Sequence, residues 1–462
     1  MSFSSNGRII DPARLGSPEF RADYGVKYAY TAGAMYKAIA SEALVVALAK
    51  AGLIGFFGTG GLTLPRIDAA IESIKSQVTE SQSFGMNLLH NPAQPEVEDQ
   101  TVDLFLSRGI RFVEASAYME VTPSVVRYRL RGLSRGPGDT INTPHLILAK
   151  VSRPEVARAF MSPAPENIVK ELVAAGRLTP QEAELGRHIP LAGDICVEAD
   201  SGGHTDQGVA YALMPAMLYL RDEMMSRHSY RKRIRVGAAG GIGGPTAAAA
   251  AFTMGADFIT TGSVNQCTVE AGISDSVKSM LQDINVQDTT YAPAGDMFEL
   301  GAKVQVLKKG VLFPGRANKL YELYTRHNSL DEIDSQTRKQ IEEKYFGRSF
   351  EDVWSETKNY YSRVNPGFEK FEPSPKQKMG FIFRWYFAHT TRLAMSGVED
   401  EKVNYQVHCG PALGAFNQWV KGTALESWRN RHVNDIGERI MNGAAAVLTK
   451  RYVEVTLNDR RN

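Results

Sequence analysis

A histidine follows two glycines in the stretch EADSGGHTDQG, which runs from Glu198 to Gly208 between two apolar segments. A tight turn needs one glycine, so the pair Gly202 and Gly203 predicts that the backbone approaches a ligand closely there. The imidazole of His204 would face that ligand, and its ordinary pKa of about 6.5 suits proton transfer near neutral pH. The alternative is a histidine on the surface or in the core, with no chemical role.

Two further glycine clusters end apolar runs, AAGGIGG at 238–244 and TTGS at 260–263. Glycines there let backbone N–H groups meet a phosphate, so they predict a phosphate site, although glycine-rich turns without a chemical role are also common. Lys150 and Asn87 lie on two other apolar runs. Lys150 could offer a positive charge to a ligand, or it could be a solvated charge at the end of a strand. Asn87 could offer a hydrogen-bonding amide, or it could be a helix or turn cap.

With TAGAM at 31–35, these residues fall on or at the ends of six of eight short apolar segments that alternate with helix-period stretches. We interpret the segments as strands at Tyr28–Tyr30, Leu53–Gly58, Phe84–Leu89, Arg111–Ser116, His145–Lys150, Asp194–Ala199, Ile234–Gly241 and Asp257–Ser263. Eight strand–helix units in about 250 residues predict an α/β fold, a (β/α)8 TIM barrel of parallel strands. An open doubly wound sheet is the alternative. In a barrel, function lies where strands end, so unusual residues at these ends favour an active site there.

The pattern changes after Ser263. We expect a barrel domain over residues 1–300 and a helical region over 301–462 that packs on the barrel, because no strand alternation is convincing in that region. The aromatic block Phe381–Phe387 could line an apolar slot or form a packed helical core. Between the fifth and sixth strands the sequence predicts two extra helices, with Pro180 near the start of the second.

Composition argues against several classes of protein. The formal net charge of +2 gives no electrostatic reason to expect nucleic acid or an anionic membrane as the main partner. Three widely spaced cysteines, Cys196, Cys267 and Cys409, form neither a disulfide framework nor a metal-binding pattern. The sequence has no apolar run of about 18 residues and no signal-peptide core at its N-terminus. We therefore expect a soluble cytoplasmic protein without a bound metal.

Four motifs together resemble the flavin-binding pattern of the nitronate monooxygenase family, which FMN-dependent enoyl-acyl-carrier reductases share. They are FGMN in the third strand, EADSGGH after the sixth, AAGGIGGPTAAAAAFTMGAD at the seventh and TTGS at the eighth. Three longer segments, AKVSRPEVARAFMSPAP, GAKVQVLKKGVLFPGRANKLYELY and CGPALGAFNQWVKGT, resemble the PfaD-type family. Its members are trans-acting enoyl reductases that serve polyunsaturated fatty acid and polyketide synthases. The resemblance covers nearly the whole chain.

The resemblance implies FMN at the mouth of the barrel. Lys150 would stabilise the negative charge of the reduced flavin, and His204 matches the family histidine beside the flavin ring, so these two are the predicted catalytic residues. The predicted cofactor-binding residues are Lys150, with Gly33, Ala34, Met35 and Asn87 at the ring, and Gly202, Gly203, Gly240, Gly241, Gly262 and Ser263 at the phosphate.

The implied activity is reduction of the 2,3 double bond of an enoyl thioester on an acyl carrier protein. NADPH would be the hydride donor, and His204, or a water that it positions, the proton donor. The helical region would meet the carrier protein, and its basic residues Lys308, Lys309, Arg316 and Lys319 could face an acidic carrier surface. A solvated helix face is the more ordinary interpretation of these charges. Synthase modules are the expected partners, and a homodimer is left open.

Two other functions remain open. One is a nitronate monooxygenase-type flavin oxidase, and the other is a non-catalytic flavoprotein scaffold that docks synthase subunits. Ser201 stands where nitronate monooxygenases usually have a small apolar residue, and this departure weakens any inference to nitronate chemistry.

Overall fold

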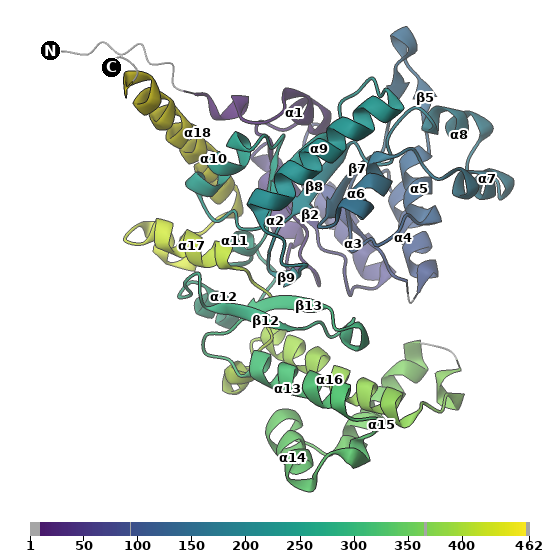
Figure 1. Cartoon of the computed structure of the whole chain (residues 1–462), viewed down its shortest axis with the longest axis vertical. Helices are drawn as coiled ribbons and strands as arrows, with labels where there is room; N and C mark the ends of the chain where they lie inside the picture. Colours follow the sequence, from purple (N-terminus) through teal and green to yellow (C-terminus); the bar gives the residue numbers. More distant parts are fainter. Residues whose placement is uncertain (1–9, 93, 365–366, 459–462) are drawn as a thin grey trace. The chain divides into compact units, whose positions relative to one another are not determined.

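The chain forms two units, and the computed structural model describes residues 10–92, 94–364 and 367–458 (Figure 1). The barrel unit comprises Met1–Ser201, Asp206–Gly272 and Ala415–Asn462; the second unit comprises Gly202–Thr205 and Ile273–Gly414. This division differs from the predicted boundary at residue 300. The C-terminal segment belongs to the barrel unit because its last helix packs on the barrel helices, and a four-residue segment joins the second unit because it pairs with a strand there.

Eight parallel strands close into a barrel in the order β1-β11-β10-β8-β7-β4-β3-β2. They are β1 (Tyr30–Ala32), β2 (Ile54–Phe57), β3 (Gly85–Leu89), β4 (Phe112–Ser116), β7 (Leu146–Val151), β8 (Asp194–Glu198), β10 (Arg235–Ala239) and β11 (Ile259–Thr261). Each of the eight overlaps a strand predicted from the sequence. Closure is made by β1 and β11, where Thr31 pairs with Thr260. The predicted TIM barrel is therefore confirmed, and the open sheet is excluded.

Helices of the barrel unit connect and flank these strands. They are α1 (Pro18–Tyr24), α2 (Glu42–Lys50), α3 (Leu64–Lys75), α4 (Pro95–Ser107), α5 (Pro123–Leu130), α6 (Pro154–Met161), α7 (Glu166–Ala174), α8 (Pro180–Gly186), α9 (Ala210–His228), α10 (Pro245–Thr253), α11 (Ser263–Gln266) and α18 (Val433–Asn458). The two extra helices predicted between the fifth and sixth strands are α7 and α8. Pro180 begins α8, and Thr179 forms a capping box with Glu182. A short hairpin, β5 (Ser134–Arg135) and β6 (Ile141–Asn142), was not predicted.

Alternate residues of each strand point into the barrel, as the two-residue period of a strand requires. On β7, Leu146 and Leu148 belong to a buried apolar core, and Lys150 is the next residue in the same alternation. On β4, Phe112 lies in that core and Glu114 is the next residue. The charged side chains of these strands therefore follow an apolar core toward the carboxyl end of the barrel.

Helix α1 closes the amino end of the barrel. Phe20 stacks on Phe258 with the ring centroids 4.5 Å apart. The hydroxyl of Tyr24 donates to Asp194 Oδ2 at 3.0 Å, and Arg235 donates to both oxygens of Asp194 at 2.6 and 2.8 Å. Asp194 and Arg235 begin β8 and β10, so this buried pair joins helix α1 to two barrel strands. The amino end of the barrel is thus closed, and the carboxyl end is available for a site.

At the same end, Asp23 should contribute stability that acid removes. Its Oδ2 accepts from Arg235 and Lys232, each at 2.6 Å. Burial alone would raise its pKa, but the hydrogen bonds and charges of Lys232 and Arg235 lower it overall. Asp23→Asn should therefore lower the free energy of unfolding by about 1.5 kcal/mol at neutral pH. Since a lowered pKa stabilises only the ionised form, the difference should persist from neutral pH down to about pH 5 and shrink below about pH 4. Urea unfolding of both proteins across this range measures it, and a difference independent of pH would contradict the assignment.

Helix α18 packs closely on the barrel helix α10. A Cβ on Gly443 would come within 2.4 Å of Pro245, and one on Gly437 within 2.9 Å of the Tyr30 ring. Ala248, Ala249 and Ala251 of α10 are buried. The alanine run is thus a close-packed helix face, because small side chains on both helices let the backbones approach.

The second unit contains a three-stranded sheet in the order β12-β13-β9, with antiparallel pairing. Its strands are β9 (Gly203–His204), β12 (Thr289–Pro293) and β13 (Lys303–Leu307); its helices are α12 (Asp275–Leu281), α13 (Phe313–Arg326), α14 (Ser335–Gln340), a π-helical turn (Ile341–Phe346), α15 (Phe350–Val364) and α16 (Pro375–Ser396). Helix α17 (Pro411–Val420) returns the chain to the barrel unit. The helices agree with the predicted helical region, whereas its sheet was missed.

The aromatic block lies on α16 and forms the core of the second unit. Phe383, Tyr386 and Phe387 are at most 3% exposed. Phe387 packs on Phe298 with the ring centroids 5.4 Å apart, and Phe313 stacks on Tyr386 at 5.9 Å. Of the two interpretations offered by the sequence, the packed helical core is the one that the structure shows.

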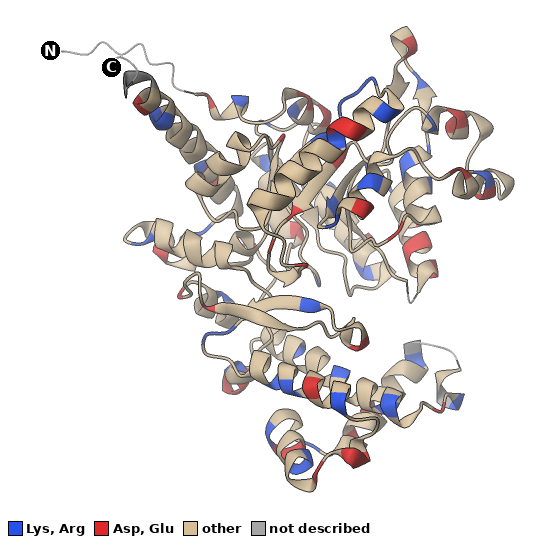
Figure 2. Cartoon of the chain, in the orientation of Figure 1, with Lys and Arg blue, Asp and Glu red and all other residues tan. Residues whose placement is uncertain are grey.

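Charge is mixed along both units, with basic and acidic residues on the same elements, such as α9 and α13 (Figure 2). Among the described residues, no helix combines the length and apolar character needed to cross a membrane. The same residues contain no group of three or more His, Cys, Asp or Glu side chains that could hold a metal ion. Cys196, Cys267 and Cys409 are all buried, and none is in a disulfide.

Candidate active site

Three charged side chains meet at the carboxyl ends of neighbouring barrel strands. Lys150 Nζ, on β7, lies 3.5 Å from Glu114 Oε1 of β4 and 3.6 Å from Glu198 Oε1 of β8. The Glu114 side chain is fully buried, and those of Lys150 and Glu198 are 21% and 22% exposed. Burial disfavours the charged amine, but the carboxylates of Glu198 and Glu114 outweigh it and raise the pKa of Lys150. Lys150 is therefore a fixed positive charge in the barrel mouth.

Glu114 is held by a network of hydrogen bonds. Its Oε2 accepts from the Ala34 backbone N–H at 3.1 Å, and its Oε1 accepts from Ser116 Oγ at 3.1 Å. Asn87 Nδ2 donates to the Glu114 carbonyl oxygen at 2.9 Å and to Ser116 Oγ at 3.0 Å. The amide nitrogen of Asn87 is thus used within the barrel, and its side-chain oxygen is the atom that could meet a ligand.

Glu114 was not among the predicted site residues. A glutamate inside the apolar run RFVEAS is the sign that could have found it, because a charged residue is seldom fully buried without a partner. Ser201 also gains a role, since its Oγ donates to Glu198 Oε1 at 3.0 Å. The serine that departs from the family pattern therefore holds one of the two carboxylates beside Lys150.

The loop after β1 lies against the same cluster. A Cβ on Gly33 would lie 3.1 Å from Thr260 Cγ2 and 3.3 Å from Glu114 Oε2. The Met35 carbonyl packs on Gly58 so closely that a Cβ there would come within 1.7 Å of the carbonyl oxygen. The predicted ring-binding segment thus lies beside Lys150's partner Glu114, and glycines at 33 and 58 allow that approach.

Two glycines after β10 and β11, Gly241 and Gly262, leave open space beside the backbone. Gly240 and Gly241 have φ angles of +82° and +74°, a region that favours glycine. A Cβ on Gly240 would come within 2.6 Å of the Ala199 carbonyl oxygen, whereas one on Gly241 or Gly262 would meet no atom within 4 Å. The open backbone forms a cradle that side chains would otherwise fill. A phosphate fits such a place, because backbone N–H groups can reach it.

The residues of the barrel mouth therefore fit FMN, with open glycine backbone for the phosphate and a partly buried cation for the ring. Those of the barrel unit that could hold it are Gly33, Ala34, Met35, Asn87, Lys150, Gly240, Gly241, Gly262 and Ser263. Gly202, Gly203 and His204 belong to the second unit.

In the second unit, the two glycines before His204 have conformational reasons of their own. A Cβ on Gly202 would come within 2.7 Å of the Cys409 backbone, and Gly203 has a φ angle of +87°. Gly203 pairs with Gln305 of β13 in the three-stranded sheet. His204 Nε2 lies 2.9 Å from Asp296 Oδ1. The glycines thus allow a short strand that places His204 beside Asp296, a carboxylate that was not predicted. The role of Gly202 and Gly203 at a phosphate stays a prediction.

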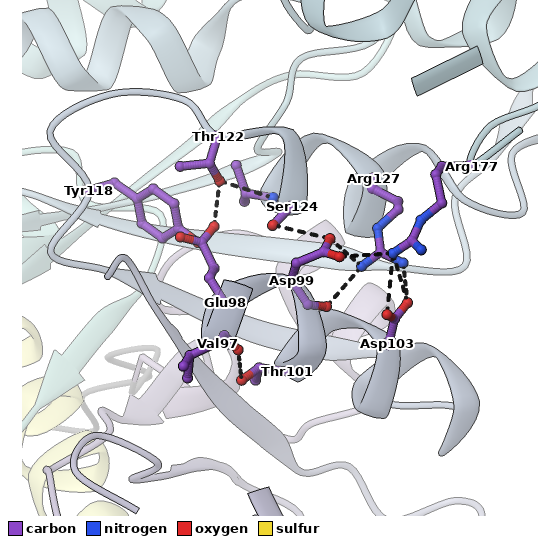
Figure 3. A network of polar contacts seen from close by, with 11 residues as sticks. Val97, Glu98, Asp99, Thr101, Asp103, Tyr118, Thr122, Ser124, Arg127 and Arg177 are labelled. Atoms are coloured by element: carbon purple, nitrogen blue, oxygen red, sulfur yellow. Dashed lines mark hydrogen bonds and ion pairs between the residues drawn. The ribbon is translucent and has the colours of Figure 1, made fainter. Parts of the chain in front are cut away.

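A separate polar network ties the outer helices of the barrel unit together (Figure 3). Arg127 of α5 donates to Asp99 of α4 at 2.7 Å and also to Asp103. Arg177, which follows α7, donates to Asp99 at 3.0 Å and to Asp103 at 3.1 Å. Arg127, Arg177, Asp99 and Asp103 each have a charged partner on another element, so we interpret these ion pairs as structural.

Two family models match the chain. The nitronate monooxygenase model matches residues 20–295, and the model of the inserted helical domain of [acyl-carrier-protein] S-malonyltransferase matches residues 327–405. The first match covers most of the barrel unit. The second lies within the second unit and includes α14, α15 and α16.

Relatives of the chain come from polyketide and polyunsaturated fatty acid biosynthesis. It is 58% identical to polyketide biosynthesis protein PksE of Bacillus subtilis, over 96% of this chain and 57% of that protein. It is 44% identical to one of the subunits of the polyunsaturated fatty acid synthase of Thraustochytrium sp., over 92% of this chain and 29% of that protein. The chain thus spans about half of the first and under a third of the second.

A solved structure is similar over almost its entire length. The enoyl reductase domain of MlnA, from the macrolactin biosynthesis cluster of Bacillus amyloliquefaciens, is 47% identical, with a TM-score of 0.92. The similarity covers 96% of this chain and 99% of that domain.

Proposed function

The chain belongs to the nitronate monooxygenase family, in its PfaD-type branch, and from this membership we propose that it is an FMN-dependent enoyl reductase. Its substrate would be a 2-enoyl thioester on an acyl carrier protein, and NADPH would be the reductant. It would act in trans for a polyketide or polyunsaturated fatty acid synthase. The proposal is supported by the similarity to the MlnA enoyl reductase domain and by relatives from both kinds of synthase.

The observation that carries this proposal is the partly buried Lys150, held charged between two carboxylates in the same mouth as the glycine cradle. FMN, when bound there, supplies hydride transfer to carbon. The chain's own part is to bind the phosphate at Gly240, Gly241, Gly262 and Ser263 and to place a positive charge near the ring. Glu114 and Glu198 fix the position of that charge.

Reduction of an enoyl thioester also needs a proton at the α-carbon, because hydride addition to the β-carbon leaves an enolate that the thioester carbonyl delocalises. We assign that proton to His204, or to a water that it positions. The imidazole is suited to the task near neutral pH, and its pairing with Asp296 supports a chemical role over a surface histidine.

The residue at position 201 weakens the nitronate alternative. Ser201 replaces the small apolar residue that is usual in nitronate monooxygenases, and its hydroxyl binds Glu198, one of the two carboxylates beside Lys150.

On the same grounds we propose two partners, an acyl carrier protein and the synthase modules. We also propose a cytoplasmic location. Lys308 and Lys309 are exposed and can meet an acidic carrier surface. Arg316 does not belong with them, because it is half-buried, hydrogen-bonds to Asn404 and lies 4.9 Å from the Tyr345 ring centroid. The expectation that Arg316 faces a carrier protein is therefore corrected, because its side chain packs within the second unit.

Anaerobic spectroscopy of the purified protein tests the proposal. The expected flavin spectrum should bleach with NADPH and return when a 2-enoyl thioester on a carrier protein is added. Oxygen consumption with a nitronate and no nicotinamide would instead support the oxidase. FMN that no enoyl thioester reoxidises would support the scaffold.

Lys150 should tune the flavin. Lys150→Met keeps the length of the side chain but removes its charge, so the reduced, negatively charged flavin is less stabilised. We expect FMN to stay bound and its two-electron reduction potential to fall by roughly 30 mV, equivalent to about 1.4 kcal/mol. Glu114→Gln removes a negative charge from the same cluster and should raise the potential. Dye-equilibrated titration measures both, and two unchanged potentials would contradict this role.

A further inference from the structure

His204 lies on a strand whose position is set by its neighbours in the second unit. Val304 and Gln305 of β13 pair with His204 and Gly203, and the Thr205 N–H donates to the Lys303 carbonyl at 3.2 Å. The backbone on both sides of the histidine is therefore tied to β13. Its ring orientation is set by the 2.9 Å contact between Nε2 and Asp296 Oδ1.

Asp296 lies in the connection between β12 and β13, and the aromatic core anchors that connection. The Ala294 N–H donates to the Ala302 carbonyl at 2.8 Å, which closes the loop at its base. A Cβ on Gly295 would come within 2.6 Å of Phe387 Cβ, and Phe298 is fully buried against Phe383 and Phe387. The carboxylate thus stands on a loop held on both sides by residues of the core.

The pair has a defined hydrogen-bond direction. Partial desolvation would raise the pKa of Asp296, but the hydrogen bond and charge of His204, with a further contribution from His408, lower it overall. An ionised carboxylate only accepts hydrogen bonds, so the hydrogen of this contact belongs to His204 Nε2. The side chains are 47% and 66% exposed, and an exposed pair adds little to stability. Its contribution is therefore orientation of the ring.

We propose that Asp296 is a positioning residue for His204, which fixes the imidazole orientation and stabilises its protonated form for proton delivery. This inference rests on the proposed function.

The test compares Asp296→Asn, Asp296→Glu and the control Glu299→Gln in the FMN-loaded protein. Glu299 lies in the same connection and pairs with Arg384 at 3.2 Å, so its substitution also exchanges a paired carboxylate for an amide. Asp296→Asn should slow flavin reoxidation by the enoyl thioester roughly 10- to 100-fold, which is part of the roughly 10²–10⁴-fold that general acid catalysis is worth. Reduction by NADPH and the thioester KM should not change. Asp296→Glu should recover part of the rate, and Glu299→Gln should match the native protein.

Two measurements separate positioning from a structural effect. Adding Asp296→Asn to His204→Ala should cause no further loss of rate, because Asp296 acts through the histidine. In protein labelled with 15N-histidine, whose His204 signal is assigned by its loss in His204→Gln, Asp296→Asn should shift the Nε2 resonance even without FMN.

The outcomes distinguish this inference from the function on which it rests. If native protein reduces enoyl thioesters and His204→Ala is slow but Asp296→Asn is not, the positioning role is overturned and the function stands. An additive double variant or an unchanged Nε2 resonance would also overturn it. Native protein without enoyl reduction would overturn the function itself, and the Nε2 resonance would still report on the pair.

Discussion

Replacing Gly262 by aspartate is expected to empty the FMN site while the barrel stays folded. Gly262 follows β11, has a negative φ angle of −129°, and has no atom within 4 Å of an added Cβ. A carboxylate there would face the proposed phosphate. Two unit charges 4 Å apart repel by about 4 kcal/mol at an effective dielectric constant of about 20, which weakens binding roughly 10³-fold. Absorbance of the purified protein gives FMN occupancy, and titration of the apoprotein gives the Kd.

Gly262→Ala is the matched control, since it adds the Cβ without the charge and should keep most of the FMN. Gly240 is a poorer choice, because its positive φ and the nearby Ala199 carbonyl would damage the backbone in any variant. Gly241→Asp should also lose FMN, although its φ angle of +74° adds strain. Full FMN content in Gly262→Asp, with native circular dichroism, would remove the phosphate from this part of the barrel.

His204→Ala is expected to divide the two half-reactions. FMN content and reduction by NADPH should stay near normal, because the imidazole is not needed for either. Reoxidation by an enoyl thioester should slow roughly 10²–10⁴-fold, the usual value of general acid assistance. Solvent deuterium at the α-carbon should lose stereochemical control. Anaerobic stopped-flow measurements of each half-reaction and NMR of the product check these results.

His188→Ala serves as the control for His204→Ala. His188 is also an exposed histidine beside a carboxylate, with Nε2 3.5 Å from Glu184, but it lies beyond α8 and outside the proposed site. It should change neither half-reaction. If His204→Ala slows only the reductive half-reaction, His204 serves nicotinamide or flavin binding. If it slows neither, another donor protonates the α-carbon.

The barrel could be predicted because its signals are local. Each strand is a short apolar run next to a helix-period stretch, and eight repeats of that pattern leave few architectures. The sheet of the second unit could not be predicted in this way, because β9 has only two residues and pairs with β13 about a hundred residues later. Its glycine-rich sequence looks like a ligand loop, and nothing local indicates a strand.

Candidate site residues could be predicted where a residue ends a strand, and not where its partner comes from elsewhere in the chain. Lys150 stands out in the sequence because it ends an apolar run, and its role at the flavin stays a prediction. Glu114 was missed because a single glutamate within a strand carries no motif, and its meaning comes from the closing of the barrel around it. Asp296 was missed because 92 residues separate it from His204, and an aspartate after a glycine predicts only a turn.

The return of the chain to the barrel at residue 415 has a consequence for its synthesis. All eight strands have been made by residue 261, but α18, which covers Pro245 and the Tyr30 ring, begins only at Val433. At 5–20 residues per second, the ribosome needs roughly 10–30 s to make the stretch between. During that time the apolar seam on the nascent barrel has no covering helix from its own chain. The inserted unit therefore imposes a delay during which the barrel lacks α18, and its exposed apolar seam can aggregate or bind chaperones.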